Sequence, residues 1–158
     1  MFINQRFTIH TSLSPAEVRA KLAEVVEPRK TLRWRWSKSE KPYEGEIGEH
    51  SFKISRIINY RNSFLPQIAG RIQPNGAGSE VEITMNLKGL VIGFMLFWLG
   101  MVLQFGILFL AAMISEGKFE PAGLIPVGMF VFGCFMPFVG FVPEAKKSKQ
   151  FLTELLER

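Results

Sequence analysis

Residues 79–100 read SEVEITMNLKGLVIGFMLFWLG, and the pattern of apolar residues changes within this stretch. In its first half, apolar and polar residues alternate, which is typical of a β-strand with one buried face. From Gly89 to Ser115 there is no charged residue, and about 20 apolar residues in a helix are enough to cross the hydrocarbon core of a bilayer. The stretch therefore predicts a strand that leads directly into a transmembrane helix. The alternating apolar residues are Val81, Ile83, Met85 and Leu87.

A second uncharged run extends from Ala122 to Val142 and contains the single cysteine, Cys134. Two buried core helices of this length would need a large soluble domain around them, and the rest of the 158 residues is too small for that. We therefore predict a two-helix transmembrane hairpin over residues 89–143, with spans at about 89–115 and 122–142. Residues 1–88 then form a cytoplasmic α+β domain. Residues 144–158 form a C-terminal amphipathic helix that packs either on this domain or on the membrane surface.

The first 88 residues carry clear signals for a helix and for strands. Ser14, Pro15 and Glu17 form the start of a helix, because they suit the N-cap, the first helical position and the third position of a capping box. Pro28 is expected to end this helix. The fold class predicted is α+β, with an antiparallel sheet, one N-terminal helix, a C-terminal helix and the hairpin. Alternation predicts strands near residues 3–9, 32–36, 43–47, 52–54, 68–72 and 81–87.

Two family resemblances accompany these patterns. The opening FTIHTSLSPAEVRAKLAEV (residues 7–25) and the order of elements resemble START-like (helix-grip) domains, although larger members have two helices after the first strand and this chain has one. This resemblance implies a binder of a lipid or another apolar ligand. SFKISRIINYRNSFLPQIAGRI (51–72), SEVEITMNLKG (79–89) and FWLG (97–100) resemble a family of small uncharacterised bacterial membrane proteins. That resemblance implies a bacterial inner membrane and no particular activity.

The distribution of charge predicts the orientation of the hairpin. The loop between the two runs holds Glu116, Lys118 and Glu120, whereas the other ends of the runs are flanked by lysines. Because basic residues are enriched on the cytoplasmic side of membrane proteins, both termini are expected in the cytoplasm. The flanking lysines are Lys88, Lys146, Lys147 and Lys149.

YRNSFLP at residues 60–66 lies between two predicted strands. If neighbouring strands pair antiparallel, the strand at 79–88 runs towards the membrane and the turn at 60–62 returns to the membrane surface. We therefore predict lipid contact by Tyr60, Arg61, Phe64 and Leu65, together with the four lysines, since tyrosine suits the head-group layer and arginine suits lipid phosphate. Alternatively, Asn62 supplies only the turn conformation, and Arg61 is solvated or paired with a glutamate.

Small residues gather on one face of each predicted span. On the first span this face consists of Gly89, Gly93 and Gly100, with Gln104 close to it. Such faces let helices approach closely, and a glutamine amide in a membrane favours a protein partner over lipid. The faces either pack the hairpin against itself or receive a helix from a partner membrane protein. On the second span the face consists of Pro126, Gly133, Pro137 and Gly140.

Other motifs give little support for catalysis or for nucleic-acid binding. RWRW at 33–36 is explained by alternation on one strand, and His10 and His50 have no acidic or cysteine partners at ligand spacing. No catalytic or nucleotide-binding signature is present. We therefore expect a non-enzymatic integral membrane protein without a cofactor, acting as an accessory or assembly subunit. The alternative is a START-like binder of a lipid or other apolar ligand at the membrane surface.

Overall fold

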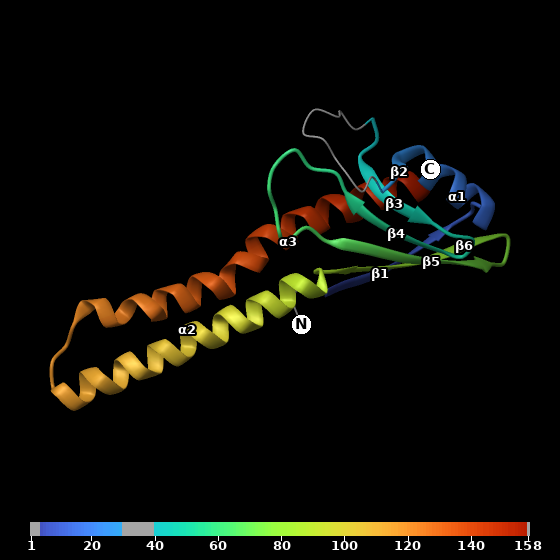
Figure 1. Cartoon of the computed structure of the whole chain (residues 1–158). Coiled ribbons are helices and arrows are strands. Elements are labelled where there is room, and N and C mark those ends of the chain that lie inside the picture. The colour runs from blue at the N-terminus through green and yellow to red at the C-terminus, as the bar shows by residue number, and fades with distance from the viewer. Residues whose placement is uncertain (1–3, 30–39, 158) are drawn as a thin grey trace.

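The computed structural model describes residues 4–29 and 40–157. The fold is α+β, with a six-stranded mixed sheet of order β1-β6-β5-β4-β3-β2 and two long helices that project from it side by side (Figure 1). The predicted fold class is thus confirmed. The elements are β1 (Asn4–Thr11), α1 (Pro15–Val25), β2 (Val26–Pro28), β3 (Tyr43–Ile47), β4 (Ser51–Arg56), β5 (Gln67–Asn75), β6 (Gly78–Asn86), α2 (Gly89–Glu116), the 3₁₀ helix η1 (Pro121–Leu124) and α3 (Ile125–Glu157).

The start of α1 is as predicted, but its end is not. The Ser14 hydroxyl accepts a hydrogen bond from the backbone N–H of Glu17, and the Glu17 carboxylate accepts one from the backbone N–H of Ser14 at 2.7 Å. The helix ends at Val25, and Val26 turns directly into β2. β-branched valines suit a strand better than a helix end, and Pro28 closes the short strand at the edge of the sheet.

The sheet is mixed because of β2, which pairs parallel with β3 through Val26 opposite Tyr43. All other pairs are antiparallel, including β1 with β6. The expectation of a purely antiparallel sheet was therefore wrong at this edge. α1 passes into β2 without a loop, and β2 therefore enters the edge of the sheet in the same direction as β3. The strand predicted at 32–36, with RWRW, lies outside the described residues.

One face of the sheet carries the core. α1 and the C-terminal part of α3 cover it, and the side chains between them and the sheet are fully buried (Figure 1). The opposite face is polar and open, with Arg6, Lys53 and Glu82 exposed. This separation explains the strict alternation along β6. Central members of the core are Leu22, Ile54, Ile68, Ile83, Met85, Phe141, Leu152 and Leu156.

The predicted second span and the predicted C-terminal helix are one continuous helix, α3. Pro137 and Pro143 lie inside it, so neither proline ends it. The helix runs from the tip of the hairpin to the domain core, where Ala145, Leu152 and Leu156 are fully buried. Of the two sites considered for the C-terminal segment, the structure therefore selects the domain. One continuous helix connects the hairpin to the centre of the domain.

α2 and the helix that includes α3 are long and apolar enough to cross a membrane. Within the most apolar 18 residues of each helix, only 11% are buried in the first helix and 17% in the second. Core helices of a soluble domain would be mostly buried, so these helices present a large apolar surface to their surroundings. Leu90, Phe97 and Ile114 are among the most exposed side chains on it.

Candidate functional site

The loop at residues 57–66, which contains YRNSFLP, lies at the base of the hairpin (Figure 1). It joins β4 to β5, and β5 begins with Gln67 opposite Asn86 at the end of β6. Since α2 begins at Gly89, the loop and the start of the first long helix occupy the same end of the sheet. This is the placement that counting strand directions predicts. Contact of the loop with lipid stays a prediction.

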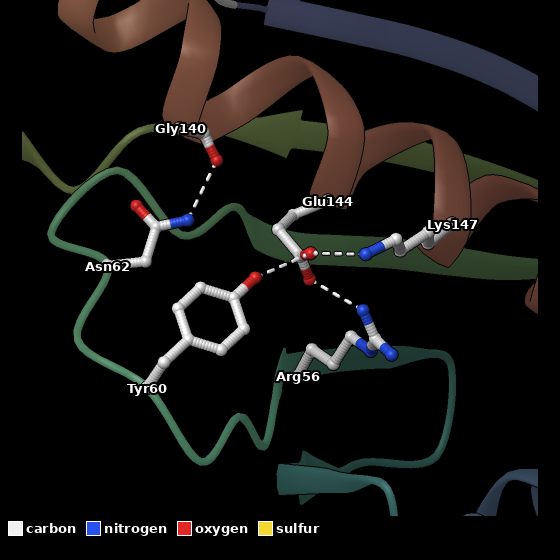
Figure 2. A network of polar contacts seen from close by, with 6 residues as sticks. All are labelled: Arg56, Tyr60, Asn62, Gly140, Glu144 and Lys147. Carbon is white, nitrogen blue, oxygen red and sulfur yellow. Dashed lines mark hydrogen bonds and ion pairs between the residues drawn. The ribbon is translucent and has the colours of Figure 1, made fainter.

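Asn62 holds the loop in shape and fastens it to α3. Its side-chain oxygen accepts a hydrogen bond from the backbone N–H of Phe64 at 2.9 Å, and its amide group donates one to the backbone oxygen of Gly140 at 2.8 Å (Figure 2). A Cβ atom on Gly140 would lie 2.8 Å from the side chain of Phe64. Gly140 is thus needed for the close approach of loop and helix, and it does not pack one helix against the other.

Glu144 is the centre of a polar network that sequence analysis missed. Its carboxylate is buried, with 2% of the side chain exposed. It accepts hydrogen bonds from the Tyr60 hydroxyl at 2.7 Å, from Arg56 Nη1 at 2.6 Å and from Lys147 Nζ at 3.1 Å (Figure 2). The one feature of the local sequence that points to this network is a glutamate two residues after the end of the second apolar run. The network joins the end of β4 and the loop to α3.

The carboxylate of Glu144 is held in its ionised form. Burial raises its pKa, but the hydrogen bonds from Tyr60 and Lys147 and the hydrogen bond and charge of Arg56 outweigh this and lower the pKa below 4.5. The bond to Glu144 in turn raises the pKa of Tyr60 above its usual value. A carboxylate that stays charged at neutral pH and already has three donors serves as a structural clamp.

The clamp predicts a pH-dependent stability. Folding lowers the pKa of the Glu144 carboxyl group. The carboxylate therefore contributes fully to the free energy of unfolding at pH values above 4.5, its pKa in the unfolded chain, and this contribution is lost as the pH falls through the lower pKa of the folded state. At neutral pH, Glu144→Gln should lower the free energy of unfolding by about 1–3 kcal/mol. On acidification the gap between wild type and variant should close. Thermal unfolding in detergent over a pH series measures this gap, with Glu157→Gln as the control, and a constant gap at every pH would contradict the clamp.

The other residues predicted to contact lipid divide into two groups. Leu65 is only 9% exposed, and Phe64 is partly buried against Gly140, so much of the apolar surface of these two residues faces the protein, and their contact with the acyl region stays a prediction. Their apolar surface is used to seat the loop on the protein. The polar residues are exposed, although Lys147 pairs with Glu144 and the ammonium of Lys149 lies 5.1 Å from the centre of the Phe7 ring. The exposed group consists of Tyr60, Arg61, Lys88, Lys146, Lys147 and Lys149.

The two small-residue faces have different surroundings. Gly133 lies against Trp98 and Leu99, so the face on α3 packs the hairpin against itself at this position, whereas its last member, Gly140, packs against the loop. On α2, by contrast, Gln104 is exposed, and a Cβ atom on Gly93 would have no neighbour within 4 Å among the described residues. Self-packing is therefore wrong for the first face, which points away from α3. The same open surroundings hold for Gly89 and Gly100.

Comparison of the chain with protein-family models, with curated proteins and with solved structures gave no match. Within the described residues, no group of three or more histidine, cysteine and acidic side chains is arranged to hold a metal ion. Inferences about function therefore depend on the geometry of the hairpin and of its base.

Proposed function

We propose that this protein is a two-pass integral membrane protein that acts without catalysis, as an accessory or assembly subunit of a membrane complex. Its α+β domain and both termini lie in the cytoplasm, and the short loop that contains Lys118 lies on the other side. The exposed apolar surface of α2 and α3 supports insertion in a membrane. The exposed lysines at the base of the hairpin support the orientation, because basic residues favour the cytoplasmic side. The resemblance of YRNSFLP and its flanking segments suggests a bacterial inner membrane.

The single observation that carries the proposal is the uncovered face of α2. Gln104 lies near the middle of this helix and is exposed, and the glycines Gly93 and Gly100 on the same side have open space above them. Polar side chains within a membrane usually face other protein segments, where they find hydrogen-bond partners. Glycines allow the backbone of another helix to approach closely. The occupant that fits is a transmembrane helix of a partner protein.

The domain and the hairpin are suited to act as one unit in such a complex. α3 is continuous from the hairpin to the core, and the loop is fastened to it by the bonds of Asn62 and Glu144. A partner helix that binds α2 is thereby held at a fixed position relative to the cytoplasmic domain. The buried carboxylate of Glu144 uses two of its three contacts, those to Arg56 and Tyr60, in this fastening, and the third is to Lys147 on α3 itself, which supports a non-catalytic role.

The START-like alternative would place an apolar ligand between the sheet and the C-terminal helix. In that space the rings of Tyr43 and Phe151 lie 5.3 Å apart, and Leu22 and Leu152 are fully buried. Buried side chains from α1, the sheet and α3 thus occupy the place where an interior ligand would lie. We therefore favour the subunit over an interior ligand.

Gly93→Leu tests the proposal. We expect this change to strip co-purifying membrane proteins, because a leucine separates two closely packed helices and lipid offers no compensating hydrophobic gain. Gln104→Leu should have a smaller effect, about 0.6 kcal/mol or roughly threefold, as is typical of hydrogen bonds between membrane helices. Purification from the native membrane in mild detergent, with quantitative mass spectrometry, measures the loss.

The matched control is Ala112→Leu, at an exposed position of α2 about 100° around the helix from Gly93 and outside the glycine face. The thermal stability of the protein alone should be unchanged in all three variants. Should Gly93→Leu and Ala112→Leu retain the same set of proteins, the subunit proposal loses its main support. If Gly93→Leu instead loses a second copy of this chain and no other protein, the partner is another copy and the complex is a homo-oligomer.

A further inference from the structure

Two hollows meet on the outer side of α3. The first, of about 480 Å³, lies between the loop at 57–66 and α3 and includes Tyr60, Arg61 and Lys147. The second, of about 590 Å³, follows the outer face of α3 from Val127 to Val139. Both are lined by Met136 and Val139, so they adjoin on the surface of α3. Together they form one site with a polar end at the base of the hairpin and an apolar end along it.

The polar end has an excess of positive charge. Arg61 lines it and is exposed, with no bonded partner among the described residues. Lys147 also lines it, and 60% of its side chain is exposed although it pairs with Glu144. Arg56 already balances the carboxylate of Glu144, so three cations against one anion leave a charge of +2. Guanidinium and ammonium groups in such a setting bind phosphate oxygens.

The apolar end has the length of an acyl chain in one leaflet. Val127 and Val139 are twelve residues apart, which at about 1.5 Å per residue corresponds to about 18 Å. One leaflet contributes about 15 Å, half of the hydrocarbon thickness of about 30 Å. Gly128 makes a notch in this groove, since no described residue lies within 4 Å of the position of a Cβ atom. The remaining lining consists of Val131, Phe132, Phe135 and Met136.

From the adjacency of a cationic hollow and an apolar one, we infer that the site binds one anionic phospholipid. The phosphate contacts Arg61 and Lys147, the Tyr60 hydroxyl lies beside the head group, and an acyl chain follows the groove past Gly128. A free phosphate ion would use the polar end alone, whereas the groove requires a lipid. The inference rests on the proposed insertion in a membrane and deepens it, because it assigns a specific lipid to the base of the hairpin.

Arg61→Gln is the cleanest test, because Arg61 bonds no other described residue and its loss leaves the fold intact. The full chain is reconstituted in phosphatidylcholine vesicles that contain phosphatidylglycerol and is then extracted in mild detergent. Native mass spectrometry measures the phosphatidylglycerol retained per protein. We expect about a fivefold reduction, the effect of one basic residue near an anionic head group. The control is Lys146→Gln, which removes an exposed charge one residue from Lys147 but outside the site.

A second variant separates a lipid from a free phosphate ion. Gly128→Leu fills the groove without a clash and should also lower the retained phosphatidylglycerol, whereas Gly93→Leu on the other helix should not. Equal retention by Arg61→Gln and Lys146→Gln would overturn the inference. So would unchanged retention by Gly128→Leu, which would reduce the site to an anion site.

Insertion itself is measured separately, so that the two proposals can fail independently. Single cysteines at Lys118 and Lys149, in a Cys134→Ser background, should label from opposite sides of the membrane. Labelling from one side would overturn both the topology and the lipid site. Labelling from opposite sides, with no selective loss of lipid in Arg61→Gln, would overturn the lipid site alone.

Discussion

Leu152→Ala should lower the free energy of unfolding of the protein by about 2–5 kcal/mol, the usual cost of truncating a fully buried leucine. Leu152 has no exposed surface and lies in the core between α3 and the sheet. The surrounding side chains come from different elements and can close only part of the cavity that the change leaves. Chemical denaturation of the detergent-solubilised protein, followed by the fluorescence of its tryptophans, measures the loss.

The same variant distinguishes the two positions that the sequence allows for the C-terminal segment. An amphipathic helix on the membrane surface would lose affinity for vesicles when Leu152 is truncated, but the stability of the domain would not change. Glu154→Ala, an exposed neighbour on the same helix, is the control and should have a small effect. A stability loss in Leu152→Ala no greater than in Glu154→Ala would show that α3 does not belong to the core.

Gly133→Leu should be the most damaging change within the hairpin. Even a Cβ atom at this position would overlap the ring of Trp98 and would lie 3.0 Å from Leu99. Overpacking costs about 1–3 kcal/mol in a core that can adjust. In a membrane, separating the two helices also forfeits their dispersion contacts without any hydrophobic compensation. We therefore expect a lower yield and a lower thermal midpoint for the protein on its own.

The control for Gly133→Leu is Gly93→Leu, the same substitution on the open face of α2. The two variants should give opposite results. Gly133→Leu destabilises the isolated protein, and Gly93→Leu leaves it stable but removes the partner. If both variants were equally stable, α2 and α3 would not pack through Gly133 in the membrane.

Two consequences follow from the continuity of α3. A disturbance of the helix pair at Gly133 is transmitted to the base of the hairpin, because no hinge loop separates it from Glu144. The Asn62 and Glu144 bonds then link the position of the loop to that of the hairpin. The lipid that we place at Arg61 would add a further link between loop and helix at the same point.

The sequence by itself determined the elements that depend on local patterns. The capping box of Ser14 and Glu17 specifies the start of α1, and the period of two along Val81–Leu87 specifies β6. The uncharged runs specify two long helices, and the succession of strands brings YRNSFLP to the base of the hairpin. Each of these conclusions needs only residues a few positions apart, or the rule that neighbouring strands pair antiparallel.

The tertiary structure alone decided the rest, because the deciding contacts join residues far apart in the chain. Glu144 becomes a clamp only when Arg56 and Tyr60, 88 and 84 positions earlier, are brought to it. Leu65 is buried in the protein, and Phe64 packs against Gly140, a residue 76 positions later in the chain. The two glycine faces look alike by helical periodicity, yet one meets Trp98 and the other meets no described residue. Periodicity fixes which residues share a face, but what that face contacts depends on how the whole chain packs.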